Sequence, residues 1–455
     1  MPNTLFQGFE TITSKQWKQQ IQFELKGLDY NETLVWESPE GIKVKPFYHK
    51  DEDFKTNSST TQATNFKIVQ NIFVYDVEKS IKKAKNVLLR GADSLRFTIA
   101  DDTVEISKLL SEIDLEKTTI YINLQFLSID FIKKINQFAA LKNVVIYCQI
   151  DPIHQLASDG NWFETPEKDN LETLNTISNT CQNVAIVTVK SGIYQNAGAN
   201  MVQQLAYTLC HLNEYFNPIK TINHAIIIEV SVGTNYFFEI AKLRALRLLF
   251  NTLASEYNHD LDCEIIVTPT KRNKTLYDYN TNMLRTTTEC MSAILGGANG
   301  ISNLAYDAIY HKDNEFGDRI ARNQLLILKH ESYFDKVNNP ADGTYYIENL
   351  TEQLAEKALH LFKELESNGG LIQLLKDGTI QKKIQESDLK EQNLFDDGKE
   401  ILLGTNKYPN SNDRMKGELE IFPFVKIKPR KTLIKPIIEK RLAEKLEQQR
   451  LENEK

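Results

Sequence analysis

The stretch AIIIEVSVGTNYFFEIAKLRALRLLFNTLASEYNHDLDCEIIVTP, residues 225–269, decides the fold of this chain. It contains two short apolar runs, 225–232 and 263–269, separated by a segment with apolar residues at three- and four-residue steps, 236–254. This is the pattern of a strand, a helix and a second strand parallel to the first. The same unit recurs along most of the chain.

Eight apolar runs alternate with helical patterns from about residue 70 onward. They are 71–77, 94–99, 118–124, 143–150, 183–189, 225–232, 263–269 and a weaker run at 300–305. A (β/α)8 TIM barrel closes with eight parallel strands that alternate with helices. A doubly wound open sheet is the alternative, but the phosphate-binding motifs GxGxxG and GxxxxGK[ST] of such sheets are absent. We therefore predict an α/β fold of the TIM barrel type.

Extensions flank the predicted barrel on both sides. We assign residues 66–405 to the barrel with its following helices, including a mostly helical region at 316–403. Residues 1–65 are predicted to form an N-terminal extended arm and linker, whose hydrophobic side chains should pack on this barrel or on a partner. Residues 406–455 are predicted to form a C-terminal linker and an amphipathic helix that starts near Pro436. The hydrophobic residues of the arm include Trp17, Leu25, Leu34, Trp36 and Phe47.

Composition excludes several classes of function. The 455 residues carry a net charge of −7, so no global positive field attracts nucleic acid or an anionic membrane. No stretch approaches the roughly 18 apolar residues of a membrane span, and the N-terminus does not resemble a signal peptide. The five cysteines lie apart from one another in the sequence, which favours reduced thiols over a disulfide framework. We therefore expect a cytoplasmic protein with no nucleic-acid or membrane partner.

The predicted strands have one apolar and one polar face. Side chains of alternating positions point to opposite sides of a strand, so the polar set should face the barrel interior. An ordinary barrel interior is filled by branched aliphatic side chains. The polar set indicates either a lumen that admits water and a ligand or strand ends near the active-face loops. It includes Arg96, Tyr121, Gln149 and Glu229.

Motifs for metal binding or nucleophilic catalysis are not found. The eight histidines have no HxH, HxxxH or HExxH spacing, and a GxSxG motif is absent. Asp151 and His154 follow the fourth strand, where a loop residue satisfied by its own backbone is the simpler interpretation. Arg285, followed by three threonines on a predicted helix, could bind an anion or hold a neighbouring loop by hydrogen bonds.

Several longer segments resemble the methylmalonyl-CoA mutase family. They are TLVWESPEGIKVKPFY (33–48), SGIYQNAGA (191–199), TLYDYNTNMLRTTTECMSAILGGANGI (275–301) and the long segment 316–370 that begins FGDRIARNQLLILKHES. The family combines an N-terminal arm, a (β/α)8 barrel whose lumen admits a coenzyme A thioester, and a C-terminal flavodoxin-like domain that carries adenosylcobalamin. The resemblance therefore implies that this chain has the same barrel fold and is part of an isomerase.

The chain departs from the catalytic pattern of this family in three places. The DxHxxG motif of the cobalamin domain does not occur, so we expect no cobalamin-binding flavodoxin-like domain. The family's catalytic histidine, in SGYHMQEAGA, aligns with Ile193 or Tyr194. The Arg-Gln-Tyr-Ala-Gly-Phe segment is replaced by IVQNIFVYDVEKSIKKAKN at 68–86. We expect no catalytic, cofactor-binding or metal-binding residue, and only vestigial substrate-lumen residues: Arg96, Tyr121, Gln149, Glu229 and Arg285.

The resemblance then implies a supporting role in propionate metabolism. We expect the small, non-catalytic subunit of a heterodimer whose large subunit holds adenosylcobalamin and interconverts (R)-methylmalonyl-CoA and succinyl-CoA. In that case the acyl-CoA substrate binds mainly in the partner. The alternative is the substrate barrel of a split acyl-CoA mutase, completed by a separate cobalamin-binding protein. A third hypothesis is a barrel that keeps thioester binding for another purpose, such as sensing.

Overall fold

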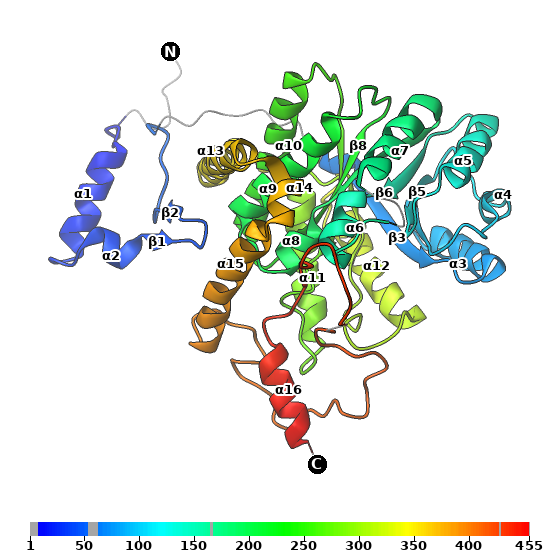
Figure 1. Ribbon diagram of the computed structural model, residues 1–455. Coiled ribbons are helices and arrows are strands. Elements are labelled where there is room, and N and C mark those ends of the chain that lie inside the picture. Colours follow the sequence, from blue (N-terminus) through cyan, green and yellow to red (C-terminus); the bar gives the residue numbers. More distant parts are fainter. Residues whose placement is uncertain (1–7, 53–61, 164–166, 427–428, 455) are drawn as a thin grey trace.

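A closed parallel barrel forms the centre of the computed structural model (Figure 1). The structure describes residues 8–52, 62–163, 167–426 and 429–454. Within them, eight strands close in the order β10-β3-β4-β5-β6-β7-β8-β9, and each pairs in parallel with its neighbours. The prediction of a TIM barrel is confirmed. The strands are β3 (Lys67–Phe73), β4 (Ser94–Ile99), β5 (Thr119–Leu124), β6 (Ile146–Ile150), β7 (Val184–Lys190), β8 (Ile226–Val232), β9 (Cys263–Pro269) and β10 (Gly300–Ile301).

Helices surround this barrel and continue beyond its last strand. Those that follow successive strands are α3 (Val77–Leu89), α4 (Ile106–Leu110), α5 (Ile129–Lys142), α6 (Pro152–Asp159), α7 (Glu167–Thr180), α8 (Gly192–Asn196), α9 (Met201–Phe216), α10 (Tyr236–Glu256), α11 (Thr281–Leu295) and α12 (Glu315–His330). Three more confirm the predicted helical region: α13 (Tyr345–Ser367), α14 (Gly370–Lys376) and α15 (Thr379–Asp396). α10 is buried along most of its length, because α9, α11 and α13 pack around it.

The hydrophobic core lies between the strands and the helices. Leu95, Phe97 and Ile99 of β4 are fully buried there, which confirms the predicted apolar face of this strand. The alternate residue, Arg96, belongs to the opposite face and contacts residues of β3 and β8. The two-residue period of the sequence therefore sorts the side chains between core and lumen.

The first and last strands differ most from the predictions. The first strand spans 67–73 rather than 71–77, because Asp76 accepts a hydrogen bond from the backbone N–H of Lys79 and so caps α3. The last strand is shortened to two residues. Its first residue is a glycine in a tightly packed place, because a Cβ atom on Gly300 would lie 2.9 Å from side-chain atoms of Val69 and Ile266.

The N-terminal arm folds as two helices and a hairpin: α1 (Ser14–Glu24), α2 (Tyr30–Leu34), β1 (Trp36–Glu37) and β2 (Lys43–Val44). The hairpin packs on the barrel domain, since Ile42 is fully buried in the main core and the Trp36 ring lies 5.7 Å from that of Phe238. Helix α1 has no buried residue and stands away from the barrel (Figure 1). Trp17 instead stacks on Phe47 within the arm, at 4.3 Å.

The C-terminal helix begins later than predicted. α16 spans Glu444–Asn453, and the prediction of a helix from Pro436 is wrong. Residues 429–443, here called the C-terminal strap, contain no helix. The backbone N–H groups of Ile437 and Leu442 donate instead to carbonyls of Ala157 and Arg272, at 2.7 and 2.9 Å. Tertiary hydrogen bonds therefore replace the helical ones that the apolar stripe suggested.

No helix in the described ranges has the length and apolar character needed to cross a bilayer. The five cysteines are all buried and none forms a disulfide. Burial raises the pKa of the Cys263 thiol to about 11, as expected for a core thiol rather than a nucleophile.

Candidate functional site

An ion pair crosses the lumen of the barrel. Arg96 of β4 places its NH1 3.2 Å from Oε2 of Glu229 on β8. In the closed strand order β4 and β8 are four strands apart, which is the largest separation in an eight-stranded barrel. The Arg96 Nε also donates to the Asn71 side chain of β3 at 2.7 Å. Two of the predicted lumen residues therefore meet directly, and their side chains occupy the space between opposite walls.

A second contact spans the lumen along another diameter. The Tyr121 hydroxyl of β5 donates to the Glu264 carboxylate of β9, also four strands away. Lys67 of β3 pairs with the same carboxylate at 3.2 Å. The Tyr147 ring lies 5.3 Å from the Tyr121 ring, and a small cluster of apolar side chains from β3, β8 and β9 packs against the two tyrosines. Burial, reinforced by Glu264, raises the pKa of Tyr147 to about 12.

Lys190 and Gln149 complete the polar part of the lumen. The Lys190 ammonium, at the end of β7, donates to the Asn123 side chain of β5 at 2.6 Å. Burial lowers the pKa of Lys190, and the nearby Glu229 carboxylate opposes this change. Gln149 of β6 pairs in register with Asn123 and is fully buried. Neither amide atom of Gln149 has a hydrogen-bond partner among the described residues.

Sequence reasoning did not single out Glu264, Lys190 or Lys67. A signal was present for the first two. Glu264 interrupts the apolar run CEIIVTP, and Lys190 directly follows the run NVAIVTV. Their partners could not be found in the same way, because Tyr121 and Glu264 are 143 residues apart and meet only when the barrel closes.

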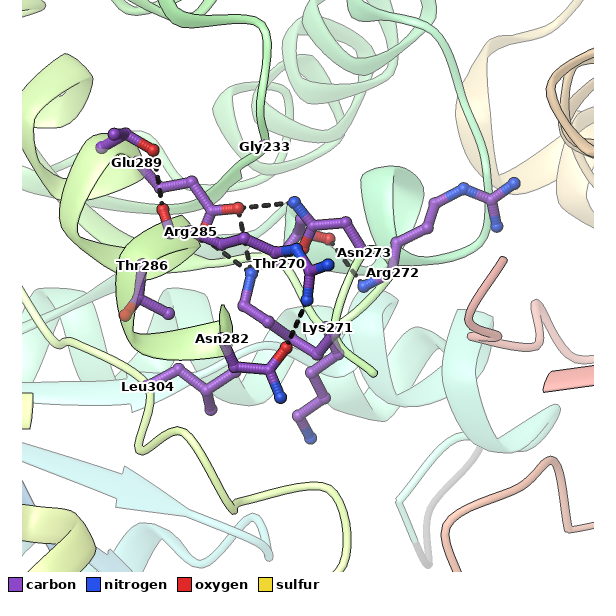
Figure 2. Close-up of polar contacts among 12 residues, drawn as sticks. Gly233, Thr270, Lys271, Arg272, Asn273, Asn282, Arg285, Thr286, Glu289 and Leu304 are labelled. Carbon is purple, nitrogen blue, oxygen red and sulfur yellow. Dashed lines mark hydrogen bonds and ion pairs between the residues drawn. The ribbon is translucent and has the colours of Figure 1, made fainter. Parts of the chain in front are cut away.

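Arg285 is not brought together with the other four predicted residues. It lies on α11, where NH1 donates to the Thr275 hydroxyl and the Asn282 side chain, at 2.9 and 2.8 Å; the Asn282 contact is drawn in Figure 2. Its NH2 donates to the carbonyl of Leu403, beyond α15, at 2.7 Å. Arg285 therefore holds a neighbouring loop by hydrogen bonds, the second of the two roles that its sequence context suggested.

The loop after β9 is held by buried, paired charges. Glu289 of α11 accepts hydrogen bonds from Asn273, at 2.6 Å, and from Lys274, at 2.8 Å; the Asn273 contact is drawn in Figure 2. Burial lowers the pKa of Lys274 and raises that of Glu289, while their mutual attraction opposes both changes. Arg272 pairs with Asp388 of α15 at 2.7 Å. These pairs stabilise the carboxyl rim of the barrel.

Ile193 and Tyr194 lie on α8, directly after β7. Ile193 lines a cavity at the carboxyl rim, whereas Tyr194 is fully buried. The Tyr194 hydroxyl lies 3.3 Å from Nδ1 of His211, whose Nε2 is 2.9 Å from the Asp151 carboxylate. Neither candidate position therefore presents an imidazole to the lumen, and the buried His211 is enclosed by its own hydrogen bonds.

Asp151 organises the loop after β6. Its carboxylate accepts hydrogen bonds from the backbone N–H groups of His154 and Lys190, at 2.8 and 2.6 Å, and from the Tyr215 hydroxyl at 2.6 Å. Burial alone would raise the pKa of Asp151, but His211 and these hydrogen bonds hold it below its usual value. Asp151 caps α6 and stays ionised as a structural anion, in agreement with the simpler interpretation of this loop.

His154 is the imidazole that the rim presents to a cavity. Its Nδ1 lies 3.1 Å from the carbonyl oxygen of Lys190, which can only accept, so Nδ1 carries the proton of the neutral ring. Burial lowers the pKa of His154. The cavity has a volume of about 680 Å³, and its lining includes Ile193 and Asn196 of α8 and Lys271 in the loop after β9.

The C-terminal strap covers this rim. The backbone N–H of Lys440 donates to the carbonyl of Asn196 at 3.1 Å. Arg441 donates from NH1 to the carbonyl of Lys274 at 2.9 Å and pairs with Glu447 of α16 at 2.6 Å. The carboxyl end of the strands, where barrels of this type hold their active sites, is therefore covered by the chain itself.

The arrangement does not fit a cobalamin cofactor or a metal ion. A flat macrocycle on the carboxyl face would need the rim positions that the strap binds. Among the described residues, no group of three or more His, Cys, Asp or Glu side chains is placed to ligate a metal. The charged side chains of the lumen are engaged with one another rather than directed at an open space. The site can hold charges in fixed positions, and we derive no catalytic step from it.

Comparison with known proteins agrees with this geometry at the level of the family. The methylmalonyl-CoA mutase family model matches residues 98–452. The chain belongs to the methylmalonyl-CoA mutase family. It is 32% identical over 449 residues to the methylmalonyl-CoA mutase small subunit of Porphyromonas gingivalis, covering 89% of this chain and 71% of that protein. The methylmalonyl-CoA mutase of Rhizobium meliloti is 27% identical over 464 residues, covering 88% of this chain and 65% of that protein.

Membership of the mutase family places the chain among isomerases. The chain spans about two thirds of the length of these two relatives. A third relative, the methylmalonyl-CoA mutase of Escherichia coli, is 31% identical over 236 residues, or 50% of this chain and 33% of that protein. The first of the three relatives carries the name of a small subunit, which implies a larger partner for that protein.

Proposed function

We propose that this chain is the non-catalytic small subunit of a heterodimeric, cytoplasmic methylmalonyl-CoA mutase. The observation that carries the proposal is the Arg96–Glu229 pair, which spans the barrel from β4 to β8. A thioester that threads the lumen would have to separate this pair and displace Tyr121 from Glu264. Separating charges that face each other in a largely buried site is unfavourable unless the ligand replaces both partners.

The rim supports the same proposal. Proton transfer and carbonyl polarisation need a group within hydrogen-bond reach of the reacting atom. Ile193 has no such group, and the Tyr194 hydroxyl is enclosed in the core beside His211. Adenosylcobalamin and the acyl-CoA substrate would then bind to the large subunit, which would convert (R)-methylmalonyl-CoA to succinyl-CoA reversibly. This chain would contribute structure rather than reacting groups.

The N-terminal arm is the proposed contact with the large subunit. Three large apolar side chains there are exposed by about two thirds or more: Phe9 at 78%, Phe23 at 80% and Leu28 at 65%. The hairpin of the same arm is anchored in the barrel domain through Ile42. The anchored hairpin would fix the arm while its exposed apolar side chains pack on the partner.

The test is turnover by the reconstituted heterodimer. The large subunit with adenosylcobalamin is assayed with wild-type chain and with the His154→Gln variant, since His154 is the imidazole that lines the rim cavity. If the chain is non-catalytic, kcat per large subunit stays within about twofold. Removing a general acid or base would lower kcat by about 10²–10⁴-fold.

The alternative, a split mutase, gives the opposite result. A separate cobalamin-binding protein added to this chain alone would then produce turnover, and His154→Gln would abolish it. A large fall in kcat of the heterodimer would also contradict the proposal. Native mass spectrometry of both complexes checks that the variant assembles, so that a loss of activity is not mistaken for a loss of subunit contact.

A further inference from the structure

A second ligand-sized cavity lies on the outside of the barrel, between its first and last helices. The α3–α12 groove runs from the end of β3, at Phe73, and the following Tyr75 along α3 and the first half of α12, and has a volume of about 760 Å³. Two ion pairs bridge it, Lys83 to Asp318 at 2.6 Å and Arg90 to Glu315 at 3.3 Å. Small-molecule sites usually have volumes of about 300–1,000 Å³. The groove is thus large enough for a nucleotide-sized ligand.

The inner wall of the groove carries an incompletely satisfied arginine. Arg322 of α12 is only 4% exposed and lines the groove. Its NH1 donates to the Gln70 side chain of β3 at 2.9 Å, but its Nε has no partner among the described residues. Burial lowers the pKa of Arg322, and Asp318 opposes this change. A buried guanidinium with an unused N–H favours an anionic acceptor, because charged donors form the stronger hydrogen bonds.

The walls of the groove carry an excess of positive charge. Among the described residues that line it, six side chains are basic and three are acidic. The two bridging ion pairs use two of each. In the described part of the chain, Lys82 and Lys312 form no ion pair, and the ammonium of Lys79 lies 5.5 Å from the centre of the Tyr75 ring. Lysines on α3 could therefore turn toward an anion on Arg322 without giving up an existing ion pair.

Helix α12 directs its N-terminus to the same place. Asn314 caps this helix of 16 residues by accepting a hydrogen bond from the N–H of Gly317, and both Asn314 and Glu315 line the groove. The positive end of a helix dipole attracts anions. Its contribution adds to that of Arg322, and the charge of Glu315 is already paired with Arg90.

The mouth of the groove is aromatic. Phe73, the last residue of β3, is 44% exposed, and Tyr75, two residues beyond it, is 72% exposed. Exposed aromatic rings beside basic side chains are typical of sites that stack a base while cations hold its phosphates. An inorganic anion alone would leave these rings without a function.

We propose that the α3–α12 groove binds a nucleotide, with its phosphates on Arg322 and the α3 lysines and its base on Phe73 and Tyr75. The site lies outside the lumen, since Arg322 bonds to Gln70 on the outward face of β3 while the neighbouring Asn71 contacts Arg96 inside. The proposal is therefore independent of whether the lumen binds a thioester and of the role of the partner subunit.

The test is calorimetric titration of the full chain with ADP, adenosine and pyrophosphate. We expect ADP to bind at one site, and the Lys79→Ala/Lys82→Ala variant to weaken it at least tenfold, more strongly at low salt. Both lysines are exposed, so their loss should not disturb folding. The matched control is Lys85→Ala on the same helix, which pairs with Glu112 outside the groove and should leave ADP affinity unchanged.

A second variant tests the inner wall. Arg322→Gln should abolish ADP binding, with circular dichroism and thermal unfolding checking that the barrel stays folded. The proposal is overturned by the absence of ADP binding at millimolar concentration, or by equal affinity in the double lysine variant. It is also overturned if pyrophosphate binds as tightly as ADP, because the site would then recognise phosphate alone. Weaker binding of both adenosine and pyrophosphate than of ADP supports it.

Discussion

The NH1 of Arg96 and the Oε2 of Glu229 lie 3.2 Å apart although their strands occupy opposite walls of the barrel. The two side chains retain 11% and 21% exposure, so the pair is largely withdrawn from solvent. The pair links β4 to β8 across the barrel and stabilises the packed interior of the lumen.

Removing one partner of this pair should destabilise the chain. Arg96→Met leaves the Glu229 carboxylate without its counter-ion in a largely buried place, and we expect a loss of about 3 kcal/mol in the free energy of unfolding. The double variant Arg96→Met/Glu229→Met should recover to within about 1 kcal/mol of wild type, because two apolar side chains then face each other. Urea unfolding followed by circular dichroism measures both.

An exposed ion pair provides the control for this comparison. Lys85 and Glu112 are each half-exposed. Lys85→Met should change the free energy of unfolding by less than about 0.5 kcal/mol. If Arg96→Met also changed it so little, the pair would not be a significant constraint on the lumen.

Stability should depend on pH through His154. Burial lowers its pKa in the folded chain, whereas the unfolded chain has the ordinary value of about 6.5. Below pH 6.5 the unfolded state binds a proton that the folded state does not. The free energy of unfolding should therefore fall as the pH drops from 6.5 toward the folded pKa, by up to about 1.4 kcal/mol per pH unit.

Comparison of variants isolates this contribution. His154→Gln should flatten the dependence of the unfolding free energy on pH between pH 5 and 7. His360→Gln, at an exposed position of α13, should leave the wild-type slope. Equal slopes in wild type and His154→Gln would show that another group titrates in this range.

The parts of the fold that could be predicted are those that depend on the local periodicity of apolar residues in the sequence. Leu95, Phe97 and Ile99 alternate with polar residues, so their burial follows from the two-residue period of a strand. The same period placed Arg96 and Tyr121 on the opposite face. Their partners were not predictable, because closure of the barrel brings together residues 133 and 143 positions apart. The sequence pattern therefore predicts on which face of a strand a side chain lies, whereas the barrel topology determines which residues it contacts.

The C-terminal strap shows a second limit of sequence patterns. Ile438, Leu442 and Leu446 have the spacing of an amphipathic helix, yet Ile438 lies in irregular chain and Leu442 in a turn, both before α16 begins. The hydrogen bonds from this backbone to carbonyls of the rim contribute more free energy than the intrinsic helix propensity, which is small per residue. Arg285 is a similar case, since its partner Leu403 is 118 residues away.

Loosening the strap should expose its backbone without unfolding the barrel. Arg441 is 5% exposed and compensates the buried Glu447, so Arg441→Ala should destabilise strap docking by about 3 kcal/mol. Hydrogen–deuterium exchange at the amides of Lys440 and Leu442 should then accelerate by about 100-fold, while exchange in the strands stays slow. Lys445→Ala, at an exposed position of α16, is the control and should leave these amides protected.

The anchoring of the arm can be tested at one buried side chain. Ile42 is fully buried in the main core, and Ile42→Ala should cost about 2–4 kcal/mol through lost packing and the cavity it leaves. Because this loss falls on the hairpin, tryptic cleavage after Lys43 should become faster, as measured by mass spectrometry of the fragments. Phe23→Ala removes an equally apolar side chain that is 80% exposed on α1, and should leave the cleavage rate unchanged. Equal rates for all three chains would mean that the hairpin is not held by the core contact of Ile42.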